Sequence, residues 1–470
     1  MRKYILSVIL SLTTFISISQ TRFTGIWVGK MNVGTELRIV FYIKQDESKN
    51  YTAVIDLPDQ GLKGIVSKDV SVKNDSLTII VKDFQGSYSG KLRNDTTIAG
   101  SWKQGISTPL ELKKVEKVET VQRPQTPIPP FSYKSEDIVY SNKDGSVQYG
   151  ATITIPSGKG PFPAVVLITG SGQQNRDEEI FGHKPFAVIA DQLTKNGFVV
   201  LRADDRGVGQ TTGMNASVTT LDFCDDVSVG LDYLIGRKEV NKNKLALIGH
   251  SEGGMIAPIL AAKRKDITAI VLMAAPGKPT TELLIEQNEA ILTSMGFSKE
   301  YLKSYLELYS AILYLMKNNN NKDSAKTMVS AQVEGWMQRT NKNIVVATTG
   351  IMNDERKAAY IDAMVEAFSS SWFKYFLNYE PQQYIEKLTC KVFAINGSKD
   401  VQVISKTNLA GIEASLKKSK SKGYLIKEYE GLNHLFQKCK LCSTMEYGKI
   451  DETISPAVLK DITDWLKAEM

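Results

Sequence analysis

The chain has 470 residues, of which 42% are hydrophobic and 23% are charged, which is the composition of a folded soluble protein rather than a disordered one. This length exceeds that of one ordinary domain and predicts two or three domains. The formal charge of +7 comes from basic residues that are scattered along the sequence, so it indicates a solvated basic surface and argues against nucleic-acid binding.

The N-terminus has the pattern of an export signal. Arg2 and Lys3 precede an apolar run, residues 4–16, and Ser17 and Ser19 then supply the small residues that a signal peptidase recognises. The run is short for a bilayer span, and a buried N-terminal helix is the alternative. We expect residues 1–19 to be a signal peptide and the mature protein to be periplasmic or secreted, without a membrane contact after cleavage.

Residues 20–115 have the pattern of an all-β domain. Short alternating stretches separated by turn residues such as Asn74-Asp75 and Asn94-Asp95 predict strands at 36–43, 51–55, 76–81, 87–92 and 97–102. We expect a small barrel or sandwich. Residues 116–132 contain several prolines among polar residues and predict an extended linker.

From residue 133 onward the pattern becomes that of an α/β domain. Apolar strands are predicted at 147–155, 164–169, 198–202, 245–248 and 267–274, with helices at 185–196, 219–234 and 252–263. Buried strands that alternate with helices predict a parallel sheet covered on both faces. Residues 133–277 are therefore the first part of this core.

Residues 278–388 interrupt the alternation with helical patterns only. Apolar residues recur at helical spacing from Leu302 to Met316, and an all-helical insertion in an α/β sheet predicts a cap. The alternation resumes in 389–470, the second part of the core, with strands at 391–395 and 424–429 and helices at 403–416 and 455–470.

The segment Gly249-His250-Ser251-Glu252-Gly253 is a G-x-S-x-G motif between a predicted strand and a predicted helix. A serine on such a turn projects its hydroxyl above the sheet, and small flanking residues are needed to make the turn. An ordinary tight turn is the alternative. The context favours Ser251 as a nucleophile.

A nucleophilic serine needs a base and an acid, which follow it in the order acid, then histidine, in this kind of fold. The chain has three histidines, and His434 alone follows Ser251. Asp400 leaves the strand at 391–395 through a small-residue turn, where a helix N-cap or turn aspartate is the alternative role. We therefore predict the catalytic triad Ser251, Asp400 and His434.

An oxyanion hole requires two backbone N–H groups that point at one position. We expect Glu252 to supply one, and Ser171, with Gly172 as the neighbouring candidate, to supply the other from the loop after strand 164–169. No cluster of residues has metal-ligand spacing, so we expect neither a metal nor another cofactor.

The other polar residues near these motifs have structural interpretations. We expect His250 to pack beside the nucleophile, and His183 to lie at the rim of the site or on the surface. Asp204, Asp205 and Arg206 predict an ion pair and a turn at the end of a strand.

The chain has four cysteines. Cys224 and Cys390 are predicted to be small buried hydrophobic residues. Cys439 and Cys442 are predicted to form a loop-tightening disulfide or to remain two thiols, and a redox pair or half of a zinc site is disfavoured because no second C-x-x-C exists.

Several segments together resemble the exported bacterial serine esterases of the EstD type, which belong to the α/β-hydrolase superfamily and are distant kin of prolyl oligopeptidases. These segments are 58–64, 100–105, 170–178, 182–186, 204–209, 249–254, 372–376, 396–400 and 432–436, so the resemblance covers nearly the whole mature chain. It implies an α/β-hydrolase fold with a helical cap insertion, preceded by a small all-β domain. It also implies the triad Ser251, Asp400 and His434, and carboxylesterase activity.

We therefore expect a secreted serine carboxylesterase that hydrolyses short-chain acyl esters through an acyl-enzyme intermediate, with a small acyl ester as its partner. One alternative is an exported serine peptidase of prolyl-oligopeptidase kinship. The small β-domain shows no repeats and argues against it, although Asp177, Glu178 and Glu179 could hold a substrate ammonium. The other alternative is a glycan- or peptide-binding protein built on a hydrolase shell, which would not need a triad.

Overall fold

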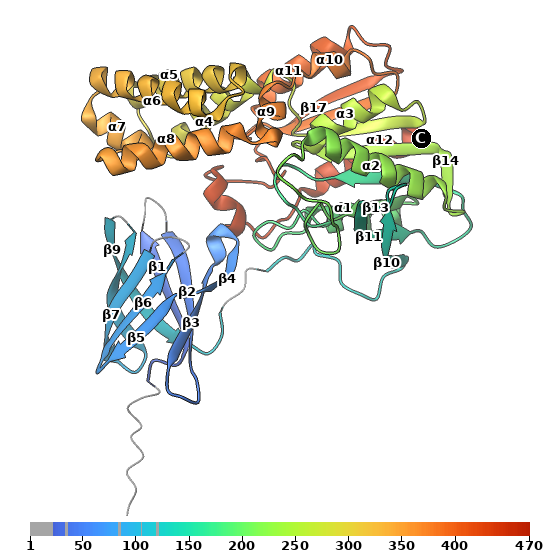
Figure 1. The fold of residues 1–470 in the computed structure, drawn as a ribbon. Coiled ribbons are helices and arrows are strands. Elements are labelled where there is room, and N and C mark those ends of the chain that lie inside the picture. The colour runs from blue at the N-terminus through green and yellow to red at the C-terminus, as the bar shows by residue number, and fades with distance from the viewer. Residues whose placement is uncertain (1–21, 33–35, 83–85, 105, 119–121) are drawn as a thin grey trace, which may run out of the picture. The chain divides into compact units, whose positions relative to one another are not determined.

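The structure is a computed structural model that describes residues 22–32, 36–82, 86–104, 106–118 and 122–470. The chain forms two compact units, Met1–Thr120 and Val121–Met470, whose elements are labelled in Figure 1. The predicted signal peptide, residues 1–19, lies outside the described residues. Within the described ranges, no helix is long and apolar enough to cross a membrane.

The described part of the first unit is a single nine-stranded antiparallel sheet. Its elements are β1 (Gly25–Asn32), β2 (Glu36–Gln45), β3 (Tyr51–Leu57), the 3-10 helix η2 (Pro58–Gln60), β4 (Leu62–Val66), β5 (Asp69–Lys73), β6 (Ser76–Val81), β7 (Gly86–Asn94), β8 (Thr97–Gln104) and β9 (Ile106–Val115). The order across the sheet is β4-β3-β2-β1-β9-β8-β7-β6-β5. Because β3 also contacts β5, the sheet curls toward closure around a core that includes Trp27, Phe41 and Tyr88. A single curled sheet agrees with the barrel prediction and not with a two-sheet sandwich.

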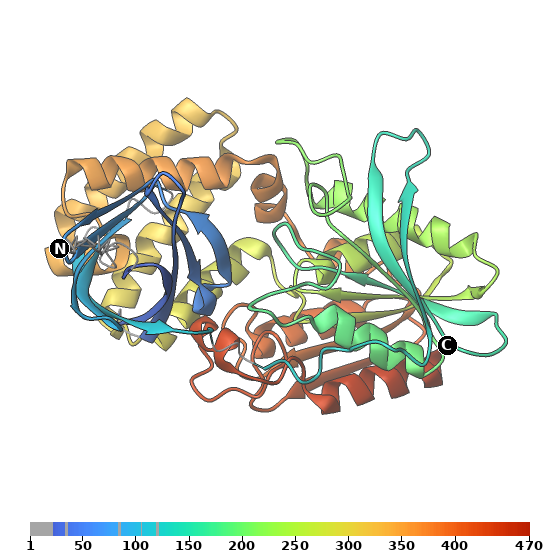
Figure 2. The same ribbon diagram turned by 90° about the horizontal axis from the view of Figure 1, so that it is seen from below.

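The second unit is built on an eight-stranded sheet (Figure 2). Its strands are β10 (Lys134–Ser141), β11 (Gln148–Ile155), β12 (Phe162–Ile168), β13 (Val199–Ala203), β14 (Val240–His250), β15 (Ile267–Met273), β16 (Lys391–Gly397) and β17 (Tyr424–Tyr429). They lie in the order β10-β11-β13-β12-β14-β15-β16-β17. Strand β11 is antiparallel to both of its neighbours, and the strands from β13 to β17 are parallel. This is the sheet of an α/β-hydrolase.

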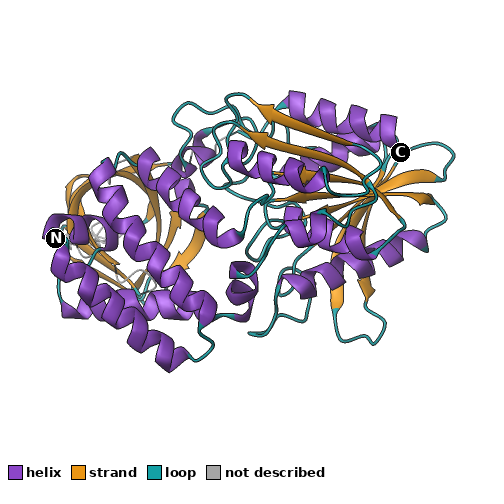
Figure 3. Ribbon diagram, turned by 90° about the horizontal axis from the view of Figure 1, so that it is seen from above, coloured by secondary structure: helices purple, strands orange, loops and turns teal. Residues whose placement is uncertain are grey.

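Helices cover both faces of this sheet, as Figure 3 shows for the purple helices beside the orange strands. One face packs on α1 (Pro185–Lys195) and α12 (Pro456–Glu469), and the other packs on α2 (Thr220–Ile235), α3 (Gly253–Lys263) and α11 (Ser405–Leu416). Alternate residues of β12 divide between the two faces, with Val165 and Leu167 on the first and Val166 and Ile168 on the second. Because both faces of the sheet are buried, strands such as β12 are continuous runs of apolar residues.

The segment between β15 and β16 is entirely helical in its regular structure. It contains α4 (Thr280–Ser294), α5 (Lys299–Asn318), α6 (Lys322–Arg339), α7 (Lys342–Thr349), α8 (Asp354–Ser369), α9 (Ser371–Leu377) and α10 (Gln382–Ile385). The stripe predicted from Leu302 to Met316 is the buried face of α5 and packs with residues of α6 such as Val333 and Trp336. Helix α9 contacts α2 of the sheet-covering layer, so the bundle is joined to the core next to β14.

Candidate active site

Four loops at the carboxyl ends of the parallel strands carry the candidate residues. They follow β12, β14, β16 and β17, which lie in the sheet order β12-β14-β15-β16-β17. Because parallel strands have their carboxyl ends at the same edge, these loops meet there. Residues far apart in the sequence can therefore form one site.

Ser251 lies on a strained turn between β14 and α3. Its φ is 53°, a left-handed conformation that is uncommon for residues other than glycine and is found at functional sites. A Cβ on Gly249 would lie 2.0 Å from the carbonyl oxygen of Gly253, and a Cβ on Gly253 would lie 2.2 Å from that of Ile168. Both glycines are therefore required for the turn to sit against its neighbours.

His434 and Asp400 form a direct, buried pair. His434 Nδ1 and Asp400 Oδ2 are 2.7 Å apart, and the two residues are 5% and 4% exposed. The other oxygen, Asp400 Oδ1, accepts from the backbone N–H groups of Gln402 and Val403 at 2.7 and 2.9 Å. Asp400 therefore has both of the roles considered for it: one oxygen closes the turn after β16, and the other contacts His434.

The turn after β16 holds the His434 loop in place. Ser398 donates its backbone N–H to the carbonyl of Tyr429 at 2.9 Å, and Lys399 donates to Leu432 at 2.9 Å. A Cβ on Gly397 would lie 2.2 Å from the carbonyl oxygen of Leu432. The close approach that this glycine permits brings Asp400 within reach of the following histidine.

Ser251 Oγ makes no hydrogen bond within the described part of the chain, so its pairing with His434 stays a prediction. The loop after β12, residues 169–184, which we call the β12 loop, lies against it: a Cβ on Gly170 would be 3.3 Å from Ser251 Cβ. In the described chain, the backbone N–H groups of Ser171, Gly172 and Glu252 donate no hydrogen bond. Three N–H groups are therefore available near the turn.

The side chain of Glu252 is buried, which the motif alone did not indicate. Its Oε1 accepts from Thr220 Oγ1 and from Trp372 Nε1, each at 2.7 Å. Burial raises the pKa of Glu252, and these two hydrogen bonds lower it in part. Trp372 lies in α9, so this contact connects the helical segment directly to the residue after Ser251.

His250 and Glu178 form a second buried pair beside the first. His250 Nδ1 is 2.9 Å from Glu178 Oε1, and His250 Nε2 is 3.1 Å from the carbonyl oxygen of His434. Glu178 Oε1 also accepts the backbone N–H of Gly170 at 2.7 Å. The prediction that His250 packs beside the nucleophile therefore left out its polar partners, because no local pattern links residues 178, 250 and 434.

The predictions that His183 lies at the rim of the site or on the surface are both wrong. His183 is 1% exposed and hydrogen-bonds to Thr453 Oγ1 at 2.9 Å and to the carbonyl of Tyr447 at 3.1 Å. Burial, assisted by Arg123, lowers its pKa to about 4. It is a neutral structural residue that fastens the segment after the His434 loop, which contains the 3-10 helix η3 (Thr444–Lys449).

Cys439 and Cys442 form a disulfide, which is the loop-tightening alternative. In the described residues, one group of side chains lies close enough to hold a metal, and it consists of these two cysteines and Glu446.

Cys224 and Cys390 are free and buried, as expected, and burial raises the pKa of each to about 12.

The acidic residues after β13 have separate partners. Asp204 pairs with Arg176 at 2.6 Å, and Arg206 pairs with Asp226 of α2 at 2.7 Å, so the predicted ion pairs form with distant residues. Asp205 accepts instead from Thr169 Oγ1 at 2.7 Å and from the backbone N–H of Gln174 at 2.8 Å.

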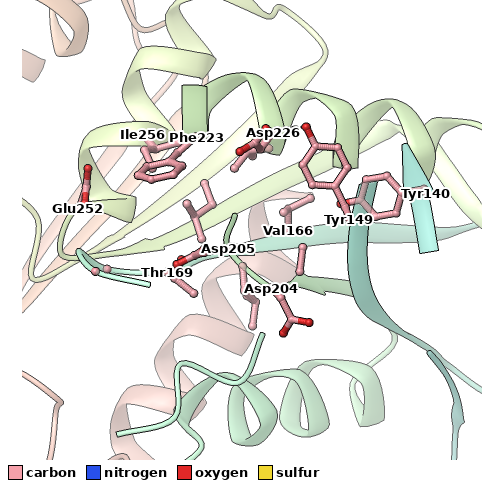
Figure 4. A pocket seen from close by; sticks show the side chains of 17 residues that line it. Tyr140, Tyr149, Val166, Thr169, Asp204, Asp205, Phe223, Asp226, Glu252 and Ile256 are labelled. Carbon is pink, nitrogen blue, oxygen red and sulfur yellow. Dashed lines mark hydrogen bonds between the residues drawn. The ribbon is translucent and has the colours of Figure 1, made fainter. Parts of the chain in front are cut away.

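A cavity of about 50 Å³ lies between α2, the sheet and the β12 loop. Gly170, Gly172 and Glu252 line it, and Figure 4 labels Phe223 and Ile256 among the other side chains that line it. The cavity therefore borders the backbone that carries the available N–H groups.

The chain is similar to known hydrolases. It is 27% identical over 344 residues to esterase EstD of Thermotoga maritima, covering 72% of this chain and 69% of the relative. It is 23% identical over 192 residues to acyl-coenzyme A thioesterase 3 of Mus musculus, covering 40% of each protein. A solved esterase structure from Pyrococcus furiosus has 14% identity and a TM-score of 0.43, and the match covers 75% of this chain and 100% of the other.

The sequence profile of the family described as serine aminopeptidase, S33, matches residues 183–437. This range is more than half of the chain and contains Ser251, Asp400 and His434. The chain therefore belongs to the serine aminopeptidase S33 family, and its second unit has the α/β-hydrolase fold.

Proposed function

We propose that this protein is an exported serine carboxylesterase that hydrolyses short-chain acyl esters through an acyl-enzyme intermediate. The observation that carries the proposal is the buried 2.7 Å contact between His434 Nδ1 and Asp400 Oδ2, at the sheet edge where β14 ends in the strained turn at Ser251. The similarity to an esterase over 72% of this chain supports it.

In the acylation step, Ser251 Oγ forms a bond to the ester carbonyl carbon while its proton moves to His434 Nε2. Asp400 accepts the Nδ1–H of His434, which leaves Nε2 free to receive that proton. The N–H groups of Glu252 and Ser171, with Gly172 as the alternative to Ser171, stabilise the oxyanion. The bond to the alcohol oxygen then breaks, and His434 returns the proton to the leaving alkoxide.

Deacylation repeats the sequence with water as the nucleophile. The water oxygen bonds to the acyl carbon, and its proton moves to His434. The bond to Ser251 Oγ then breaks, Oγ recovers the proton, and the carboxylic acid leaves. Catalytic hydrogen bonds often tighten only around substrate, so we expect the contact between Ser251 Oγ and His434 Nε2 to form when substrate binds.

The carboxylates near the β12 loop favour an esterase over an aminopeptidase. A substrate ammonium needs a carboxylate that is not already paired, but Asp177 and Glu179 pair with basic side chains and Glu178 faces His250. Burial raises the pKa of Asp205 to about 7, which disfavours its charged form at neutral pH. The acidic residues considered for ammonium binding are therefore already engaged.

The cavity beside Glu252 supports a preference for short acyl groups. With Gly172, the alternative to Ser171, and Glu252 as the two N–H donors, the acyl chain would enter the cavity of about 50 Å³ that Phe223 and Ile256 also line. The helical segment 278–388 would act as the cap over this site, a role that the hydrogen bond from Trp372 to Glu252 supports. A cap of this kind excludes water and shapes the pocket.

Export is proposed from the signal pattern of residues 1–19. The periplasm or the exterior is an oxidising environment, where the disulfide between Cys439 and Cys442 would persist. Mass spectrometry of the protein from the periplasmic and culture fractions tests this proposal. We expect a mature N-terminus near residue 20, and an intact Met1 in the cytoplasmic fraction alone would oppose export.

The activity is tested by parallel kinetics on p-nitrophenyl acetate and butyrate and on aminoacyl and prolyl p-nitroanilides. We expect kcat/KM to be higher for both esters than for any anilide. Ser251→Ala and His434→Asn should each lower kcat for the esters by about 10⁴-fold or more, whereas Ser294→Ala, an exposed serine of α4, should not. A higher kcat/KM for an anilide would favour the peptidase.

A further inference from the structure

His250 occupies a position that requires two N–H donors. It is 6% exposed, and its two ring nitrogens face a carboxylate oxygen of Glu178 at 2.9 Å and the carbonyl oxygen of His434 at 3.1 Å. Both partners are acceptors, and a neutral imidazole has only one N–H. When Glu178 is ionised, satisfying both contacts takes an imidazolium, with the Glu178 carboxylate as its counter-ion.

Glu178 is also bound to the backbone of the β12 loop. The oxygen that faces His250 accepts the N–H of Gly170 at 2.7 Å. Gly170 directly precedes Ser171 and Gly172, whose amides are the oxyanion candidates. A Cβ on Gly170 would lie 3.3 Å from Ser251 Cβ, so Gly170 is next to the nucleophile. This hydrogen bond is internal to the β12 loop, and the contact of Glu178 with His250 ties the loop to the turn that carries Ser251.

His250, the other member of the pair, contacts the loop that carries His434. His250 Nε2 contacts the main chain of His434, and the two imidazole rings have centroids 4.8 Å apart. Since His250 directly precedes Ser251, one side chain connects the β12 loop, the serine turn and the His434 loop.

We propose that His250 and Glu178 form a buried imidazolium–carboxylate pair that positions both the oxyanion-stabilising loop and His434. Both are positioning residues, because in the described part of the chain their side chains contact the Gly170 and His434 backbone and each other, and neither hydrogen-bonds to Ser251 Oγ. The catalytic part of this inference rests on the proposed esterase function, whereas the protonation of His250 can be measured without it.

The charges around His250 agree with this state. Burial lowers the pKa of His250, but Glu178, the His434 carbonyl and Asp400 together outweigh burial, so the pKa of His250 is raised. The titratable groups around His250 are Glu178 on the β12 loop, Asp400 after β16 and His434 after β17, and Asp205 after β13 is close enough to Glu178 for the two charges to interact. Loss of the His250 proton at alkaline pH would break one of its two contacts.

Glu178→Gln removes the charge and keeps the size of the side chain. An opposite charge at this distance shifts a pKa by about one to three units, so the substitution should lower the pKa of His250 by about that much. Because loss of the His250 proton releases the positioned loops, the alkaline limb of the pH profile of kcat for p-nitrophenyl butyrate should move to lower pH by the same amount, with KM little changed. Glu179→Gln is the matched control, because Glu179 pairs with Lys184 and not with His250.

The protonation itself is measured by ¹⁵N–¹H NMR of the imidazoles, which is simple to assign because the chain has three histidines. In the wild type at neutral pH we expect His250 to carry protons on both nitrogens, with neutral His183 as the internal reference. Glu178→Gln should remove one of the His250 protons at neutral pH.

A wild-type His250 with a single proton at pH 6 would overturn the proposal, as would equal shifts of the kcat profile in Glu178→Gln and Glu179→Gln. If Glu178→Gln does not fold, the wild-type spectrum alone still decides the protonation. A doubly protonated His250 in a wild type that hydrolyses no ester would refute the proposed function and leave the buried ion pair standing.

Discussion

Asp205→Asn should stabilise the protein at neutral pH, because the folded state disfavours ionisation of this carboxyl group. Burial raises the pKa of Asp205 to about 7 from the ordinary value of 3.8, with smaller contributions from Glu178 and Glu252. The folded chain thus keeps this proton to a higher pH than the unfolded chain does. The free energy of unfolding therefore falls as pH rises between about 4 and 7, and the loss is complete above pH 7.

The size of the effect follows from the shift. A difference of about 3 units corresponds to about 4 kcal/mol, and the partial exposure of Asp205 reduces the expected value to about 2–3 kcal/mol. Asparagine can keep both hydrogen bonds, since its carbonyl can accept from Gln174 N–H while its amide donates to Thr169 Oγ1. The substitution therefore removes the cost of ionisation without leaving a partner unsatisfied.

Urea unfolding of both proteins from pH 4 to pH 8 measures this effect. The stabilisation by Asp205→Asn should be near zero at pH 4 and should reach its full size by pH 8. Asp204→Asn is the control with the opposite sign. Asp204 is paired with Arg176 at 2.6 Å, so removal of its charge should lower the free energy of unfolding. A pH-independent effect of Asp205→Asn, or destabilisation at pH 8, would refute the reasoning.

Two further substitutions test the surroundings of Glu252. Trp372→Phe removes the indole N–H donor to the Glu252 carboxylate and should lower the free energy of unfolding by about 1–3 kcal/mol; unchanged urea unfolding would show that this contact is not made. Phe223→Ala should enlarge the cavity beside the β12 loop and raise kcat/KM for p-nitrophenyl hexanoate relative to acetate by about tenfold or more. An unchanged ratio would place the acyl chain elsewhere.

The sequence was sufficient for the elements that have strong periodicity. The predicted strands at 76–81 and 424–429 agree with β6 and β17 to the residue. Strand β10 (Lys134–Ser141) was not predicted, because it is an edge strand with mostly exposed positions and a mixed polar sequence. Strand β14 begins at Val240, earlier than predicted, because its first residues are polar and exposed.

The site could be predicted only as far as chain order and local motifs reach. The G-x-S-x-G turn and the order of acid and histidine pointed to Ser251, Asp400 and His434. The partners of His250 and Glu252 could not be predicted, since Glu178 and Trp372 come from distant segments that only the folded sheet edge brings together. The burial of a lone histidine such as His183 likewise depends on tertiary packing.

Fluorophosphonate labelling with peptide mapping tests most directly whether Ser251 is the nucleophile. We predict one label per chain, attached to Ser251, with loss of p-nitrophenyl butyrate hydrolysis in proportion to labelling, and much slower labelling of His434→Asn. A label on another residue, or ester hydrolysis at the wild-type rate in Ser251→Ala, would contradict the account.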